Sequence, residues 1–367
     1  MIPPLVDWLA YVGGAVIVSA AVHRYLFWLL YARPKRPASR GVRAAFVALF
    51  FLLPLGMVEL ELMTLTPRAI AAPLMWCAFT WAGFLYFAMG TLLLGDLVRA
   101  PPRAALLVAL GLSALSMWQA LRAPAITERT ISVPLFPRDG YRIVHLADLH
   151  VGAMIDRAFV EMIVARCNAL QPDLVAITGD LVDGSVPELA WHVEPLRELR
   201  AKDGVFIALG NHEYFSGADA WVAHLRTLGL AVLQNESVAR GDFDVVGVDE
   251  LSAPEFSGGH APDYERAFSA VTHPAIVLVH QPMASHEIAR RSGAVLQLSG
   301  HTHAGQIFPL GALARWDQGC LVGVCRSGAL TVHVTSGAGY WGPPMRFMSR
   351  AEIAVLTLRT EEVAEHH

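Results

Sequence analysis

Four long apolar segments fill the first third of the 367-residue chain. Each approaches the ~20 apolar residues that a helix needs to cross the hydrocarbon core of a bilayer. The segments are Trp8–Leu30, Ala44–Thr66, Ala72–Leu94 and Ala104–Leu121. We therefore predict a transmembrane region with about four helices in residues 1–125 and a separate domain in residues 126–367. A signal peptide is the alternative for the first segment, but its apolar run is too long, contains His23-Arg24 and lacks a small-residue cleavage site.

Basic residues between the apolar segments predict the orientation of this region. Two connections are rich in arginine and lysine, whereas the connection between the second and third segments contains only Arg68. Basic loops stay in the cytoplasm. An even number of spans then places the second domain on the outer, periplasmic face of the inner (cell) membrane, and an error of one span would reverse this. The basic residues are Arg33, Lys35, Arg36, Arg40 and Arg43 in the first connection, and Arg99 and Arg103 in the third.

Short buried strands alternate with helical patterns in the second domain. A linker at 123–129 precedes a possible edge strand at 131–135, and the later alternation predicts an α/β fold. About 240 residues can bury one large core. The expected strands are Tyr141–Ala147, Asp173–Thr178, Val205–Leu209, Ala275–Val279 and Ala294–Leu298, and the expected helices are Arg157–Leu170, Pro187–Arg200, Gly217–Leu228, Pro262–Ala270 and Met283–Arg291.

A polar cluster rich in Asp, His or Asn follows each of the five expected strands. In an open α/β sheet, ligands collect beyond the carboxyl ends of the strands, so these clusters are expected to meet in one small volume. One cluster alone has an ordinary structural explanation, such as a turn or helix cap, but five together indicate a site. The clusters are Asp148-Leu149-His150, Gly179-Asp180, Gly210-Asn211-His212-Glu213, His280, and Gly300-His301-Thr302-His303.

In their order and spacing the clusters resemble the calcineurin-like metallophosphoesterase superfamily. That family's pattern runs D-x-H, G-D-x-x-D-G, G-N-H-[DE], H and G-H-x-H, and residues 140–358 contain every part of it without a substitution. The resemblance implies a four-layer αββα sandwich of two mixed sheets between helices. It also implies a dinuclear site with Asp148, His150 and His303 on the first metal, Asn211, His280 and His301 on the second, and Asp180 bridging both.

The chemistry of this residue set supports phosphate hydrolysis. Two divalent ions and two aspartates leave a net positive site, and two metals 3.5–4 Å apart can activate water and stabilise phosphoryl charge. The thiolate-free ligand set suits Mn, Fe, Zn or Ni. We expect extended backbone to aim both members of Asp148/His150 and of His301/His303 at the site.

His212 adjoins an expected ligand without belonging to the ligand set. We expect it to protonate the leaving oxygen or to stabilise transition-state charge. A purely structural histidine is the alternative. Asp183 and Glu213 are expected to fix imidazole tautomers by hydrogen bonding.

The charge of the second domain makes nucleic acid an unlikely partner on physical grounds. It has 18 Lys/Arg against 28 Asp/Glu, a formal difference of −10, whereas nucleic-acid binding needs a basic surface. Cys320 and Cys325 are close enough in sequence to form a disulfide in an oxidising compartment.

Two features after His303 suggest a membrane-surface substrate. The segment Ala304–Val324 is unusually apolar, and either a hairpin in the second sheet or a lip that dips into the membrane explains it. Ser336–Tyr340, followed by Pro343, Pro344 and Arg346, resembles the carboxyl-terminal signature of a bacterial membrane-associated branch that includes UDP-2,3-diacylglucosamine hydrolases. Arg346 has two readings, a phosphate contact or a surface salt bridge.

The sequence thus favours a membrane-anchored, dinuclear-metal phosphohydrolase that acts on a phosphate ester or pyrophosphate, with a lipid-linked substrate expected. A membrane receptor or scaffold with a weakly active phosphoesterase-like domain is the alternative. Whether the bond cleaved is a monoester, diester or phosphoanhydride is open, because the same metal core serves all three.

Overall fold

The computed structural model describes residues 5–62, 66–256 and 259–360. The chain divides into two compact units, one of residues 1–122 with 342–347 and the other of residues 123–341 with 348–367. The expected division at 125/126 into separate domains stays a prediction. The expected seven-residue linker is wrong, because strand β1 already begins at Ala125 and only Arg122–Pro124 lie between it and the preceding helix.

Four helices of the first unit are long and apolar enough to cross a membrane. Candidate spans of 19 to 30 residues run through each of them. A polar contact joins two of them, because Trp81 Nε1 donates to His23 Nε2 at 3.2 Å, and within the first helix His23 Nδ1 lies 2.8 Å from the Ser19 carbonyl oxygen. The helices are α1 (Leu5–Phe27), continued by the π-helical η1 (Trp28–Ala32), α2 (Arg40–Leu62), α3 (Arg68–Leu97) and α4 (Pro102–Leu121).

A late segment of the chain, 342–347, groups with these helices. The Arg346 backbone N–H donates to the Ser116 carbonyl oxygen at 2.9 Å. Gly83 makes room for this segment, because a Cβ there would lie 2.4 Å from Met345 Sδ. Arg346 is fully buried, so its reading as a surface salt-bridge residue is wrong.

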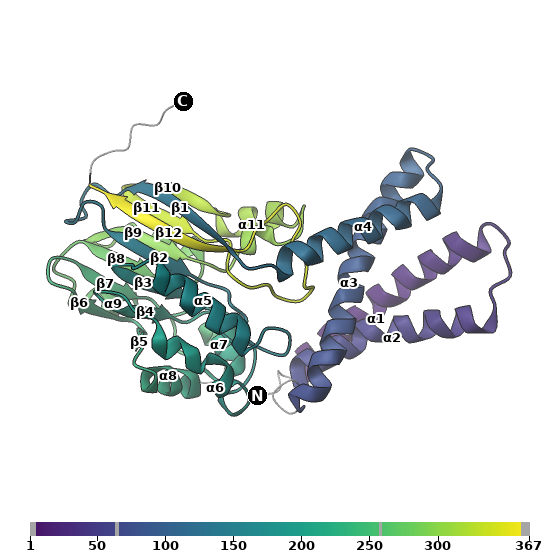
Figure 1. Ribbon diagram of the computed structural model, residues 1–367, viewed down its shortest axis with the longest axis horizontal. Helices are drawn as coiled ribbons and strands as arrows, with labels where there is room; N and C mark the ends of the chain where they lie inside the picture. The colour runs from purple at the N-terminus through teal and green to yellow at the C-terminus, as the bar shows by residue number, and fades with distance from the viewer. Residues whose placement is uncertain (1–4, 63–65, 257–258, 361–367) are drawn as a thin grey trace. The chain divides into compact units, whose positions relative to one another are not determined.

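Two six-stranded mixed sheets form the centre of the second unit (Figure 1). In the first, β2 to β5 run parallel and β12 joins β2 antiparallel. In the second, β7, β8, β9 and β11 run parallel. The first sheet has the order β1 (Ala125–Ser132), β12 (Glu352–Arg359), β2 (Arg142–Leu146), β3 (Leu174–Thr178), β4 (Val205–Ala208), β5 (Ala231–Val232); the second has β10 (Gly323–Ser327), β11 (Leu330–Val334), β9 (Ala294–Ser299), β8 (Ala275–Leu278), β7 (Asp244–Gly247), β6 (Glu236–Ala239).

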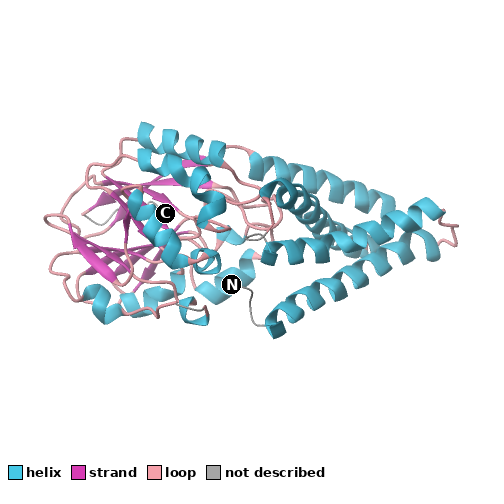
Figure 2. Ribbon diagram, turned by 90° about the horizontal axis from the view of Figure 1, so that it is seen from below, coloured by secondary structure: helices cyan, strands magenta, loops and turns pink. Residues whose placement is uncertain are grey.

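The main core lies between the two sheets. Ile143, Leu174 and Phe206 of the first sheet pack with Ile276 and Leu296 of the second in one buried cluster. A second cluster covers the other face of β7, β8, β9 and β11, with apolar residues from short helices that include Ala267 and Ile288. Helices therefore flank the stacked sheets, as Figure 2 shows, and the predicted four-layer αββα sandwich is confirmed.

Helices of this unit are mostly shorter than the sequence predicts. The pattern Pro187–Arg200 splits into α6 and a 3₁₀ turn, and Met283–Arg291 contains only one helical turn beyond another 3₁₀ turn. Two helices were not predicted, α7 and α11. The elements are α5 (Arg157–Ala169), α6 (Val186–Val193), η2 (Glu194–Glu198), α7 (Asn211–Ser216), α8 (Ala218–Thr227), η3 (Ala253–Glu255), α9 (Tyr264–Phe268), η4 (Pro282–Ala284), α10 (Ser285–Ile288), η5 (His303–Gly305) and α11 (Gly311–Gln318).

The apolar segment after His303 matches neither of its two expected forms completely. Its end is the hairpin strand β10, which pairs antiparallel with β11, but its middle forms helix α11. Trp316 on this helix is 86% exposed, and Phe308 before it is 57% exposed. A disulfide joins Cys320 to Cys325 and so ties the end of this segment to β10.

Candidate metal centre

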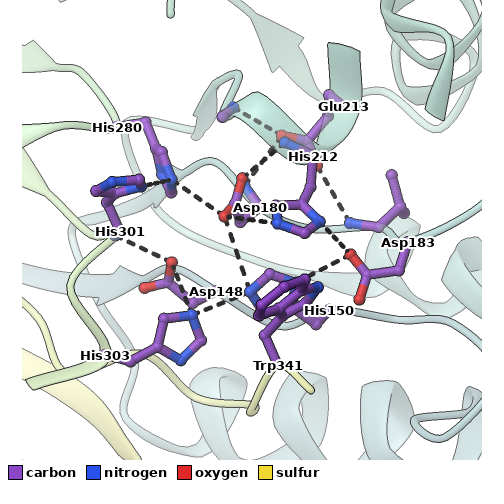
Figure 3. A network of polar contacts seen from close by, with 12 residues as sticks. Asp148, His150, Asp180, Asp183, His212, Glu213, His280, His301, His303 and Trp341 are labelled. Carbon is purple, nitrogen blue, oxygen red and sulfur yellow. Dashed lines mark hydrogen bonds and ion pairs between the residues drawn. The ribbon is translucent and has the colours of Figure 1, made fainter. Parts of the chain in front are cut away.

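All five polar clusters lie at the carboxyl ends of parallel strands. Asp148 and His150 follow β2, Asp180 follows β3, and Asn211 and His212 follow β4 at the start of α7. His280 follows β8, and His301 and His303 follow β9. The side chains labelled in Figure 3 converge on one small volume.

Asp180 lies at the middle of the cluster. Its Oδ2 atom is 3.1 Å from Nε2 of His280, 3.8 Å from Nε2 of His150 and 3.9 Å from Nε2 of His212 (Figure 3). Its Oδ1 atom accepts the backbone N–H of His212 at 3.0 Å. One carboxylate thus faces imidazoles from both halves of the expected ligand set.

Hydrogen bonds fix the imidazoles with one nitrogen turned toward Asp180. His280 Nδ1 lies 2.7 Å from the carbonyl oxygen of Thr178, which can only accept, so Nδ1 carries the proton. His150 Nδ1 faces Oδ1 of Asp183 at 3.0 Å in the same way. In their neutral forms both rings then present an Nε2 lone pair to the cluster, which is the form that binds metals.

Potential donor atoms gather in three overlapping groups, in each of which they lie within 4.8 Å of one another. Two of these groups correspond to the two expected metal positions. The third also brings His212 among the donors. The groups are Asp148 with His150 and His303, Asp180 with His280 and His301, and His150 with Asp180 and His212.

Two buried oxygen atoms in the cluster have no hydrogen-bond partner. They are Oδ2 of Asp148 and Oδ1 of Asn211, both expected metal ligands. A buried polar atom without a partner is costly unless something else satisfies it. Carboxylate and amide oxygens beside converging imidazoles form a mixed O/N donor set that suits a divalent cation, so the residues present fit the expected metals.

Charge and burial shift the pKa values of these groups in opposite directions. Burial raises the pKa of Asp148 to about 6, although the charge of His280 works against this. Burial lowers the pKa of His212, but Asp180 and Asp183 outweigh it and raise this pKa to about 9. For Asp183, the neighbouring His150 and His212 overcome burial and hold the pKa well below its usual range.

Glu213 has a different role from the one expected. It contacts backbone amides and not an imidazole: Oε2 accepts from Asp180 N and Gly210 N at 3.0 and 2.7 Å, and Oε1 accepts from Leu181 N and Val182 N at 2.6 and 3.1 Å. The buried carboxylate therefore holds the loop that carries Asp180. Asp183, by contrast, contacts both His150 and His212, as a residue that fixes their tautomers would.

The expectation of extended backbone at the paired ligands is wrong. Asp148, His150, His301 and His303 have φ angles of 54°, 50°, 70° and 49°, in the left-handed region that costs a non-glycine residue about 1–3 kcal/mol. Sharp turns, and not strand alternation, aim these side chains. Gly179 permits the close packing of the loops, because a Cβ there would lie 2.4 Å from Gly210 N.

The sequence motifs did not indicate the supporting role of Ser336–Tyr340 or the position of Trp341 and Phe215 beside the cluster. The segment Ser336–Tyr340 supports the Asp148 loop, since Gly339 N donates to the Asp148 carbonyl oxygen at 2.8 Å. Trp341 and Phe215 lie with ring centroids 5.5 and 5.6 Å from that of His212. Phe215 follows His212 by one helical turn, so a predicted α7 would have revealed it. Trp341 has no comparable local signal.

Two stacked mixed sheets carry a cluster of Asp, His and Asn side chains at their carboxyl edge, an arrangement that can hold metal ions. Comparison with known proteins gives the family. The family model described as calcineurin-like phosphoesterase matches residues 141–305. A protein of Aquifex aeolicus named an uncharacterized metallophosphoesterase is 31% identical over 59% of this chain and 85% of its own length. The chain belongs to the calcineurin-like metallophosphoesterase family.

Longer relatives come from bacteria and animals. An uncharacterized metallophosphoesterase of Helicobacter pylori is 38% identical over 66% of this chain, and the chain spans 65% of that protein. A transmembrane protein with metallophosphoesterase domain from Bos taurus is 37% identical over 70% of this chain, which spans 62% of it. Bacterial and animal proteins are thus both similar to this chain, and the resemblance to the branch that includes UDP-2,3-diacylglucosamine hydrolases stays a prediction.

Proposed function

We propose that this protein is a membrane-anchored phosphohydrolase that uses two divalent metal ions, of Mn, Fe, Zn or Ni, to cleave a phosphoester or phosphoanhydride bond. The observation that carries the proposal is the convergence of Asp148 Oδ2 and Asn211 Oδ1, both buried without partners, with imidazoles oriented to offer lone pairs. In the proposed assignment Asp148, His150 and His303 hold one ion, Asn211, His280 and His301 hold the other, and Asp180 is shared.

The bound ions would supply Lewis acidity for activating water and for offsetting phosphoryl charge. The residues of this chain would attract the phosphate group and protonate the leaving oxygen. With Asp148 and Asp180 as the only charged ligands, the occupied site keeps a net positive charge that attracts phosphate. His212 Nδ1 is held by Asp183 at 2.6 Å, which turns Nε2 toward the site, where it can give a proton to the leaving oxygen.

We further propose that the catalytic domain lies on the outer, periplasmic face of the inner membrane. Basic residues concentrate in the loops before α2 and α4 and in the first turns of these helices, which favours a cytoplasmic position for both loops. The Cys320–Cys325 disulfide supports the same orientation, because disulfides persist in oxidising compartments.

A lipid-linked substrate is the finer part of the proposal. Phe308, Leu313 and Trp316 are 57, 65 and 86% exposed, and the first of them lies five residues after the proposed ligand His303. Large apolar side chains exposed together mark a surface that contacts an apolar partner, and the four candidate spans make a bilayer the partner that we propose. We name Phe308, Leu310, Leu313 and Trp316 the apolar lip.

Hydrolysis by the purified full-length protein in detergent tests the proposal. Soluble phosphomonoesters, phosphodiesters and pyrophosphates, phospholipids and nucleotide-linked glycolipids would each be assayed with added Mn²⁺, Fe²⁺, Zn²⁺ or Ni²⁺. Turnover of one class, abolished by a chelator, supports the enzyme. Inactivity on every substrate with every metal would favour the receptor or scaffold instead.

A further inference from the structure

Two aromatic rings from different parts of the chain flank His212. The Trp341 ring centroid lies 5.5 Å from that of His212 with an interplanar angle of 71°, and the Phe215 ring lies 5.6 Å away at 62°. Both remain open to solvent, with 40% and 52% of their surface exposed. Figure 3 labels Trp341 together with His212 and the other side chains of the cluster.

Both rings are held in place before any ligand binds. Phe215 lies on α7, and the ring of Phe256 packs against it with centroids 4.5 Å apart. The Gln306 side chain clamps the backbone of Trp341, because Trp341 N donates to Oε1 at 3.1 Å and Nε2 donates to the Trp341 carbonyl oxygen at 2.8 Å. Ser349 Oγ in turn donates to the carbonyl oxygen of Gln306 at 2.8 Å. A ligand therefore meets rings that need little ordering.

The position of the rings identifies the part of the substrate that they contact. Single exposed aromatic residues are ordinary on a protein surface. These two, however, contact the imidazole of His212, which gives a proton to the leaving oxygen in the proposed function. The inference rests on that proposed function. The group attached to that oxygen would lie beside His212, whose ring has Trp341 and Phe215 as neighbours.

We infer that Trp341 and Phe215 bind the leaving group and that this group carries an aromatic ring. A saturated chain would gain only from the removal of apolar surface from water. An aromatic ring gains additionally from edge-to-face or offset contacts with both side chains, by about two- to twelvefold in affinity.

A matched pair of phosphonates tests this inference with the full-length protein. Benzylphosphonate and cyclohexylmethylphosphonate are similar in size, but only the first is aromatic. Their dissociation constants are measured by titration calorimetry in the presence of Mn²⁺. We expect wild-type protein to bind benzylphosphonate about two- to twelvefold more tightly.

Substitutions of Trp341 and Phe215 test whether these two rings cause the preference for benzylphosphonate. Trp341→Leu and Phe215→Leu should each move the affinity ratio toward one, whereas Trp341→Tyr, which keeps an aromatic ring and guards against a folding defect in the leucine variant, should retain it. Trp191→Leu is the matched control, because Trp191 is 67% exposed and stacks on Arg157 at 3.9 Å, not on His212.

The outcomes separate this inference from the proposed function. A wild-type ratio near one, or a ratio unchanged by both leucine variants, would overturn the aromatic leaving-group site while phosphoester hydrolysis stands. Absence of hydrolysis with all metals would instead reject the proposed function, whatever the phosphonates do.

Discussion

Nδ1 of His212 lies 2.6 Å from Oδ1 of Asp183. The same oxygen is 3.0 Å from Nδ1 of His150. One carboxylate therefore orients an expected metal ligand and the expected proton donor together, and it turns both Nε2 atoms toward Asp180.

Replacing His212 with Asn should reduce turnover by roughly 10²–10⁴-fold, the usual contribution of a positioned proton donor, and leave metal content nearly unchanged. The loss should shrink for esters with acidic leaving groups, which need no proton. Turnover of nitrophenyl and alkyl esters, with metal content by mass spectrometry, checks this. Equal losses for both esters would make His212 an electrostatic stabiliser, and a loss of metal would make it a ligand.

A buried histidine pair links the two sheets and predicts a pH dependence of stability. His145 on β2 and His333 on β11 lie with their Nδ1 atoms 3.0 Å apart, and both are fully buried. Burial holds the pKa of His145 well below its usual range and lowers that of His333 to about 3. Both rings are neutral in the folded state near pH 7.

The folded state should lose stability as the pH falls, because the folded and unfolded states bind different numbers of protons. Below about pH 6.5 the unfolded histidines bind protons that the folded ones exclude, so this stability is complete above pH 6.5 and is lost as pH falls. Each ring should contribute a loss of about 1.4 kcal/mol per pH unit in that range. Thermal unfolding in detergent at pH 7.5 and 5.5 should show a smaller acid destabilisation in His333→Leu than in wild type. An identical pH dependence would contradict the neutral pair.

Cysteine labelling tests the orientation of the domain. In a variant without the native cysteines, Ser39→Cys before α2 should be shielded from an impermeant thiol reagent in intact cells, and Ser269→Cys after α9 should be labelled. Both serines are exposed on the protein surface. The reverse pattern would place the metal centre in the cytoplasm and would remove the reason for the Cys320–Cys325 disulfide to persist.

The apolar lip predicts a preference for substrates presented in lipid. Burial of a large apolar side chain stabilises by about 1.5–3 kcal/mol, so Phe308→Ser with Trp316→Ser should lower turnover of a micelle-embedded phosphate ester by roughly tenfold or more. Turnover of a soluble ester and metal content should stay the same. Trp191→Ser is the control for loss of an exposed tryptophan. Equal turnover of the lipid ester in the double variant and wild type would count against the lip.

The sequence was sufficient to predict which residues converge, because each cluster follows a short buried strand and parallel strands end at a common edge. Asp180 and His280, for example, follow β3 and β8 as expected. The local conformation was not predictable in this way. The left-handed φ angles of Asp148 and His150 occur where the loop contacts distant segments: Gly339 N donates to the Asp148 carbonyl oxygen, and His150 N donates to the Asp180 carbonyl oxygen.

Long-range contacts also explain the other differences between the expected and the observed structure. β1 was expected to begin near residue 131, but pairing with β12 extends the strand back to Ala125. The hydrogen bonds between the Gln306 side chain and the Trp341 backbone join two loops. Neither loop has a sequence periodicity that predicts these bonds. Glu213 was identified as a supporting residue, but its four backbone donors become apparent only when the loops meet.

Metal content measured together with turnover, for wild-type protein and Asp180→Asn, tests the central claim most directly. Asp180 Oδ2 lies 3.1 Å from Nε2 of His280 and 3.8 Å from Nε2 of His150, one imidazole from each proposed metal position, so one substitution should weaken both. For wild-type protein we predict about two ions per chain and a metal-dependent phosphohydrolase activity. For Asp180→Asn we predict that the metal content falls toward one ion or none and that more activity is lost than in a His303→Asn variant. An Asp180→Asn protein with full metal content and full turnover would contradict the shared two-metal centre.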